Sequence, residues 1–234
     1  MHRTGELFGQ YQTLEQQKDS ATLGMWIFLA TEILFFGGLF LTYTVNRHAY
    51  PLAFGLGSNT LDIYLGTINT AVLIISSLTM AMAVWCAETD RKKLMPVYLM
   101  LTLIFGCAFL GIKFVEYKQK FDHHLVPGYN FDLRYHQEGP EHAAELQKAF
   151  EQDPGLNSHA QLYFSLYFGM TGLHALHMIV GVGLVFWLFL QSLKGKFSSR
   201  YNNPVENIGL YWHFVDIVWI YLYPLLYLID RHLR

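Results

Sequence analysis

The sequence predicts an all-α integral membrane protein with five transmembrane helices in a single transmembrane domain, residues 1–234. Hydrophobic residues make up 53% of the chain and charged residues only 15%, whereas soluble domains carry about 25% charged residues. The charges gather between five apolar runs, and each run exceeds the about 20 residues with which a helix crosses a ~30 Å hydrocarbon core. Because lipid offers the backbone no hydrogen-bond partner, these runs are expected to be helical.

The runs differ in the few charges that they contain. Glu32 is the only charged side chain in the first run, and Asp216 is the only one in the fifth. Residues 159–192 contain no Asp, Glu, Lys or Arg, and this run is longer than a span needs, so its beginning at His159 is expected in water. The helices are expected at about residues 22–46, 62–86, 94–117, 163–192 and 208–229.

Lysine and arginine predict the orientation, since they are enriched in short loops on the cytoplasmic side. The segments on the same side as the N-terminus hold eight of them, and the short segments on the other side hold three. The first group is Arg3, Lys18, Arg91, Lys92, Lys93, Lys194, Lys196 and Arg200, and the second is Arg47, Arg231 and Arg234. We therefore expect a cytoplasmic N-terminus and an extracytoplasmic C-terminus.

A long polar segment, residues 118–158, separates the third run from the fourth and is external in this topology. Within it, residues 140–152 are expected to form a short helix, with Pro140 in the first turn and Leu146, Ala149 and Phe150 on one face. Loops of this length are often functional. The segment can therefore be interpreted either as a mobile extracytoplasmic loop or as a docking surface for a neighbouring subunit.

Polar side chains inside the apolar runs are costly in a membrane, so each needs a partner or a function. Glu32 lies near the middle of the first helix, and His174 and His177 share one face of the fourth. His213 and Asp216 are likewise three residues apart on the fifth helix. The similar depths of Glu32, His177 and Asp216 predict a polar cluster, suited either to proton handling or to hydrogen bonding between helices.

Two further interpretations concern metal binding and a charged pair. The histidines and Asp216 have the chemistry of metal ligands, but transmembrane histidines also bond across helices without a metal. Lys113 and Glu116 are three residues apart near the outer end of the third helix. They are expected to form an ion pair whose lysine extends to the membrane surface.

Several motifs resemble subunit III of the haem-copper terminal oxidases, in its short five-helix form. The run WIFLATEILFF, from Trp26 to Phe36, resembles the glutamate-bearing helix of that family. His174 to Gly181 resembles its HxxHxxxG helix, and Tyr211 to Trp219, preceded by Glu206, resembles its final helix. The shorter matches are Ile68-Asn-Thr70, Glu88-Thr-Asp-Arg91 and Glu116-Tyr117.

The resemblance implies a non-catalytic subunit of a bacterial inner-membrane complex, without haem, copper or another metal of its own. Such subunits pack beside a catalytic subunit I, which reduces dioxygen and pumps protons, and haem and copper reside in partner subunits. They support proton uptake, protect the enzyme during turnover and hold phospholipids. The resemblance gives Glu32 the proton-uptake role. It also implies lipid or helix-packing contacts for six further residues, which are His174, His177, His213, Asp216, Glu206 and Lys194.

The chain departs from the family pattern in two respects. Many relatives have seven helices, with a lipid-filled cleft between the first two and the other five, whereas this chain begins at the third. The cleft is therefore open or completed by another subunit. Relatives also commonly carry an arginine near the position of Gln191, and Lys194 is the residue that could replace it at a lipid phosphate.

Several functional alternatives remain at this point. The expected partners are subunit I, subunit II and membrane lipids, with additional respiratory subunits bound through residues 118–158. The long external loop favours cytochrome c oxidase over quinol oxidase or nitric oxide reductase. A small independent proton or ion transporter is the competing class, but the sequence contains no internal repeat. The net charge of −2 gives no indication of a nucleic-acid partner.

Overall fold

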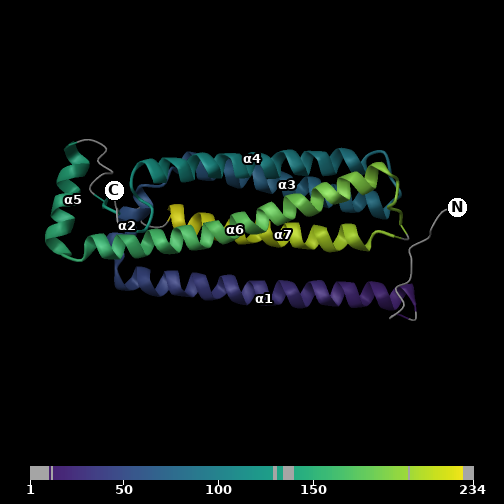
Figure 1. Ribbon diagram of the computed structural model, residues 1–234, viewed down its shortest axis with the longest axis horizontal. Helices are drawn as coiled ribbons and strands as arrows, with labels where there is room; N and C mark the ends of the chain where they lie inside the picture. Colours follow the sequence, from purple (N-terminus) through teal and green to yellow (C-terminus); the bar gives the residue numbers. More distant parts are fainter. Residues whose placement is uncertain (1–10, 12, 129–130, 134–139, 200, 229–234) are drawn as a thin grey trace. The chain divides into compact units, whose positions relative to one another are not determined.

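The computed structural model describes residues 11, 13–128, 131–133, 140–199 and 201–228. Regular secondary structure in these residues is helical, and β-type pairing is limited to a bridge between Ser198 and Tyr201. Five helices are long and apolar enough to cross a membrane, which confirms the predicted all-α class with five spans. The elements in Figure 1 are α1 (Leu14–Ala49), α2 (Pro51–Asn59), α3 (Ile63–Glu88), α4 (Met95–Asp122), α5 (Pro140–Gln152), α6 (Leu156–Leu193), α7 (Asn203–Tyr223) and the π-helical turn η2 (Pro224–Leu228).

Helices α1 and α6 begin earlier than the apolar pattern predicts, and so does α7, which starts at Asn203. Helix α1 starts at Leu14, where the Thr13 hydroxyl accepts a hydrogen bond from the Gln16 N–H at 3.1 Å and caps the first turn. Helix α6 starts at Leu156, directly after a turn in which the Asp153 carboxylate accepts the Gly155 N–H at 2.9 Å. Polar residues therefore extend α1 and α6 beyond their apolar runs.

The described chain forms two compact units, and each long helix contributes to both. Unit 1 contains residues 1–35, 72–108 and 177–217. Unit 2 contains residues 36–71, 109–176 and 218–234. The two units are considered separately below.

Trp212 of α7 organises the packing inside unit 1. A Cβ atom on Gly106 of α4 would lie 2.8 Å from the Trp212 ring, and one on Gly181 of α6 would lie 3.0 Å from it. Small residues thus let the indole lie directly against both helix backbones, as is common in membrane proteins. The Trp212 ring N–H donates to the Ser76 hydroxyl of α3 at 3.1 Å, so one side chain joins three helices to its own.

Unit 2 is held around the C-terminal turn η2. Pro224 lacks an N–H, and the chain passes from α helix into a π turn at this residue. The carbonyl of Leu225 accepts a hydrogen bond from the Tyr43 hydroxyl at 3.0 Å. The carbonyl of Leu226 accepts one from the Ser58 hydroxyl at 2.8 Å. These bonds tie α1 and α2 to the end of the chain.

The segment between α4 and α6 is partly folded onto unit 2. Helix α5 confirms the short helix expected at residues 140–152, and on the predicted face Leu146 and Ala149 are buried while Phe150 is half-buried. Asn157 of α6 accepts the Leu133 N–H at 3.1 Å and donates to the Phe131 carbonyl at 3.2 Å. These two hydrogen bonds tie residues 131 and 133 to the start of α6.

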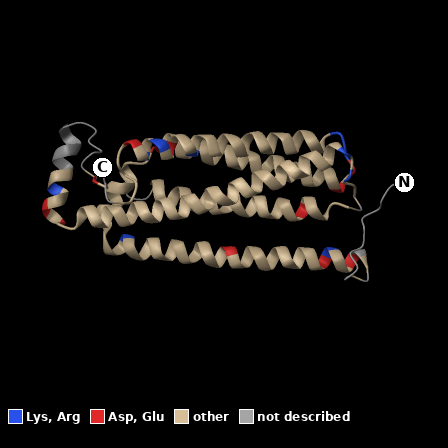
Figure 2. Cartoon of the chain, in the orientation of Figure 1, with Lys and Arg blue, Asp and Glu red and all other residues tan. Residues whose placement is uncertain are grey.

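The predicted orientation remains a prediction. Figure 2 shows Lys and Arg gathered at the turn between α3 and α4, where Arg91, Lys92 and Lys93 lie. Four of the residues that carried the orientation argument lie outside the described residues. They are Arg3, Arg200, Arg231 and Arg234.

Candidate functional site

Glu32 of α1 and His177 of α6 form an ion-pair contact in unit 1. The Glu32 Oε2 atom lies 3.3 Å from the His177 Nε2 atom, and the two side chains are 20% and 17% exposed. The α1 side chains beside Glu32 are strongly exposed, with Ile33 at 60% and Leu34 at 76%. Glu32 therefore meets His177 at the edge of an apolar surface, where a paired charge costs much less than an isolated one.

Tyr211 of α7 positions His177 from the other side. Its hydroxyl donates to the His177 carbonyl at 3.0 Å. Its ring lies stacked beside the His177 ring, with centroids 6.4 Å apart, and also contacts Phe28 of α1 at 6.1 Å. Three helices thus meet at His177, with the Tyr211 hydroxyl on its backbone carbonyl and the Tyr211 ring beside its imidazole.

His213 turns to α3 instead of joining this pair, and its Nδ1 atom lies 2.7 Å from the Ser77 hydroxyl. Asp216 is 1% exposed, and its carboxyl oxygens meet no partner at hydrogen-bond distance among the described residues. The expected cluster of Glu32, His177 and Asp216 is therefore divided, because the structure joins the first two and leaves Asp216 outside their contact.

His174 is an aromatic packing residue of unit 2. It is 1% exposed and packs edge-on against Phe109 at 5.5 Å and tilted against Trp219 at 5.1 Å. In the part of the chain that the structure describes, no three His, Cys, Asp or Glu side chains converge in a way that could hold a metal ion. The helix-packing role of His174 is consistent with these contacts.

Glu206 lies in the first turn of α7, where a carboxylate interacts favourably with the helix dipole. It accepts a hydrogen bond from the Asn202 amide, which directly precedes the helix. The next residue, Asn203, donates to the Lys18 carbonyl and the Thr22 hydroxyl of α1, each at 3.4 Å. This end of α7 is therefore tied to α1, and Glu206 stabilises the helix start.

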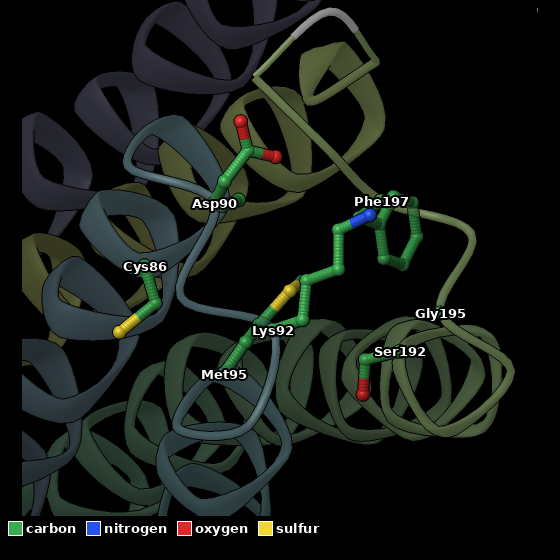
Figure 3. Close-up of a pocket in the computed structure, with 8 residues that line it drawn as sticks. Cys86, Asp90, Lys92, Met95, Ser192, Gly195 and Phe197 are labelled. Atoms are coloured by element: carbon green, nitrogen blue, oxygen red, sulfur yellow. The ribbon is translucent and has the colours of Figure 1, made fainter.

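Lys194 is exposed directly after α6. Beside it, unit 1 contains a small cavity of about 10 Å³, drawn in Figure 3, to which the turn between α3 and α4 and the segment after α6 contribute side chains. That volume corresponds to about one water molecule. The lining residues are Cys86, Ala87, Asp90, Lys92, Met95, Ser192, Gly195 and Phe197. A lipid headgroup does not fit inside this cavity, so any lipid contact of Lys194 involves the surface.

Lys113 and Glu116 form the predicted ion pair, but the prediction that the lysine extends to the membrane surface is wrong. The ammonium and carboxylate groups lie 2.9 Å apart, but the residues are only 3% and 1% exposed. The Tyr167 and Tyr227 hydroxyls both donate to Glu116 Oε1, the former at 2.7 Å. These partners satisfy the pair inside unit 2, so the lysine does not need to extend to water.

Comparisons with known proteins agree with these helices. Residues 151–230, which contain all of α6 and α7, match the family model described as cytochrome c oxidase subunit III. The chain is 28% identical over 208 residues to "Probable quinol oxidase subunit 3" of Staphylococcus haemolyticus (strain JCSC1435), with 88% of each chain covered. The relative of the same name from Staphylococcus aureus (strain USA300) gives the same identity and coverage.

The five apolar spans, their intramembrane polar contacts and these matches define a multi-pass membrane protein. Over these matches the chain is similar to subunit III of haem-copper oxidases.

Proposed function

We propose that this chain is a non-catalytic subunit of a proton-pumping haem-copper oxidase. It packs on the catalytic subunit I, alongside subunit II, and supports proton uptake and stability during turnover. Haem and copper belong to those partners, and this chain contributes no redox centre. The observation that carries the proposal is the contact of Glu32 with His177 at 3.3 Å, at the edge of an apolar surface.

The chemistry of this pair suits proton handling. Imidazole exchanges protons in the physiological pH range, and a carboxyl group within ion-pair distance can share a proton with it. An ionisable pair in a membrane span is costly to keep, and proton relays are one of the functions for which such residues are retained. Because both side chains are partly exposed, a neighbouring subunit can reach them without disturbing the packing of α1 and α6.

We propose a quinol as the electron donor. The two relatives described above are both named quinol oxidase subunit 3, and this naming outweighs the long external segment, on which the expectation of cytochrome c rested. Both relatives are bacterial, so the proposed location is the bacterial cell membrane. The purified complex should therefore oxidise a short-chain quinol faster than reduced cytochrome c, and the reverse order would assign the donor as cytochrome c.

The segment between α4 and α6 is proposed to bind an additional subunit outside the membrane. On α5, Leu146 and Ala149 are buried, whereas Gln147, Lys148 and Glu151 are exposed. The buried face thus fixes the helix to its own chain, and the polar face is free to meet a partner. Phospholipids are proposed to contact the exposed apolar side chains of α1 and Lys194.

A spectrum of the purified assembly tests the proposal. The tagged chain is purified gently from native membranes, and a reduced-minus-oxidised spectrum is recorded before and after a harsher detergent separates the subunits. Haem bands in the assembly that are absent from the separated chain support an accessory subunit. A chain that purifies alone and colourless supports a transporter instead, and colour that stays with the separated chain would make its histidines ligands.

A further inference from the structure

The Lys113 ammonium group lies in an enclosed site within unit 2. Its Nζ atom lies 2.9 Å from Glu116 Oε2, 3.0 Å from the Tyr227 hydroxyl and 3.5 Å from the Tyr167 hydroxyl. An ammonium group has three N–H donors, so each donor has an oxygen acceptor. With 3% of the residue exposed, these oxygens take the place of water around the cation.

Both oxygens of the Glu116 carboxylate, which faces this ammonium, also have hydrogen-bond partners. Glu116 Oε2 accepts from Lys113, and Oε1 accepts from the Tyr167 and Tyr227 hydroxyls. Each phenol therefore donates to the carboxylate while its oxygen faces the ammonium. A buried polar network in which every member has a partner is rigid and specific, whereas one missing member leaves an unpaired charge.

Aromatic rings enclose the remaining sides of the ammonium. Its Nζ atom lies 4.8 Å from the centroid of Trp219, 5.5 Å from those of Tyr117 and Tyr167, and 5.6 Å from that of Tyr227. All four distances fall within the about 6 Å at which a ring attracts a cation, and tryptophan is the most effective ring. Such cages bind amine ligands in other proteins, but here the ligand is tethered to α4.

We propose that Glu116, Tyr117, Tyr167, Trp219 and Tyr227 form an internal binding site for a primary ammonium ion, which Lys113 occupies. This ammonium cage joins α4, α6, α7 and η2. Since Tyr227 belongs to the turn whose carbonyls bind α1 and α2, the occupied cage holds the C-terminal turn in place. The proposal concerns unit 2 alone and does not depend on the proposed oxidase function.

Replacing the tethered ligand by a free one tests the cage. Lys113→Ala removes the ammonium and opens space for methylammonium or ethylammonium, which have the N–H donors that Glu116 and the phenols require. We expect the variant assembly to unfold at a midpoint lower by roughly 6 °C or more, and ethylammonium chloride to restore most of that loss. Tetramethylammonium chloride at the same ionic strength should restore little, because it has no N–H group.

Two variants serve as controls. Lys120→Ala also removes a buried lysine of α4, but that lysine donates to the Thr60 carbonyl, so ethylammonium should not rescue the variant. In Lys113→Ala/Glu116→Gln the carboxylate is gone, and the rescue should be lost. Equal rescue by ethylammonium, tetramethylammonium and sodium chloride would overturn the proposal, because the effect would then be one of ionic strength.

A second comparison applies if Lys113→Ala does not accumulate in the membrane. Lys113→Met and Glu116→Gln each leave one charge or polar partner unpaired, while the double variant removes both charges at similar volume. The double variant should therefore accumulate to a higher level than Lys113→Met. Each single substitution is expected to reduce the amount of protein in the membrane by some factor. If the reduction in the double variant equals the product of the two single factors, the residues do not act as a pair and the cage is refuted.

Discussion

The carboxylate of Glu32 lies 3.3 Å from the imidazole of His177, so the most centrally placed charge of α1 is paired with a histidine of α6. The Tyr211 phenol donates to the His177 carbonyl at 3.0 Å and holds this histidine in position from α7. The pair links a packing role to a proton-handling role, because the same contact fixes α1 to α6 and keeps an ionisable carboxyl group in the membrane.

Replacing His177 distinguishes a role in helix packing from a role as a metal ligand. His177→Ala removes the partner of Glu32 and the ring that stacks beside Tyr211, so we expect the chain to dissociate from its complex at lower detergent concentration. The haem spectrum and the iron and copper content of the intact complex should be unchanged. Loss of one equivalent of iron or copper on this substitution would make His177 a ligand.

The close approach of Trp212 to α4 predicts a specific response to a single methyl group. In Gly106→Ala the new Cβ atom would lie 2.8 Å from the ring, and Trp212 is fully buried and hydrogen-bonded to Ser76. Overpacking of this kind costs about 1–3 kcal/mol. A lower thermal midpoint of the purified assembly is the expected result.

Gly183→Ala is the matched control for that substitution. No atom lies within 4 Å of a Cβ placed on Gly183 in α6, and alanine favours a helix over glycine by about 0.5–1 kcal/mol. This variant should be at least as stable as the original chain. Equal destabilisation by both substitutions would show that Trp212 does not limit the space at Gly106.

The exposed charges of α5 test the proposed external partner. Lys148→Glu and Glu151→Lys together reverse the charge pattern of the exposed face and leave Leu146 and Ala149 untouched. We expect the additional subunit to be lost from the purified complex, while subunits I and II remain. An unchanged subunit composition and unchanged electron entry would contradict a docking role for this segment.

Much of the architecture was predictable from the apolar runs, because a helix that crosses lipid needs an unbroken apolar sequence. The early start of α1 was not predictable in this way, since the Thr13 cap and the polar turns after it resemble a loop in composition. The turn η2 was also missed, because an apolar sequence around Pro224 does not distinguish a π turn from a kinked helix.

The side-chain partners were less predictable than the helices. The depth of Glu32 and His177 follows from their positions in the helices, but the choice of partner depends on helix rotation, which directs His213 to Ser77 and leaves Asp216 outside the Glu32–His177 contact. Lys113 was expected at the surface because its tetramethylene stem is long enough. Its actual partners, Tyr167 and Tyr227, lie 54 and 114 residues away, and no local pattern identifies them.

The central claim is that Glu32 supports proton uptake by the catalytic subunit. The direct test is the number of turnovers that the purified complex completes before it inactivates, measured together with its steady-state rate. Glu32→Gln keeps the size of the side chain and removes its ionisable group. Glu15→Gln is the matched control, because Glu15 is an exposed carboxylate on the same helix.

We expect Glu32→Gln to keep the haem spectrum and subunit composition, but to slow proton uptake and shorten the lifetime in turnover. Glu15→Gln should match the original complex in both measurements. If Glu32→Gln instead sustains the original rate and lifetime over the full time course, Glu32 is a packing residue and the proposed role in proton uptake is wrong.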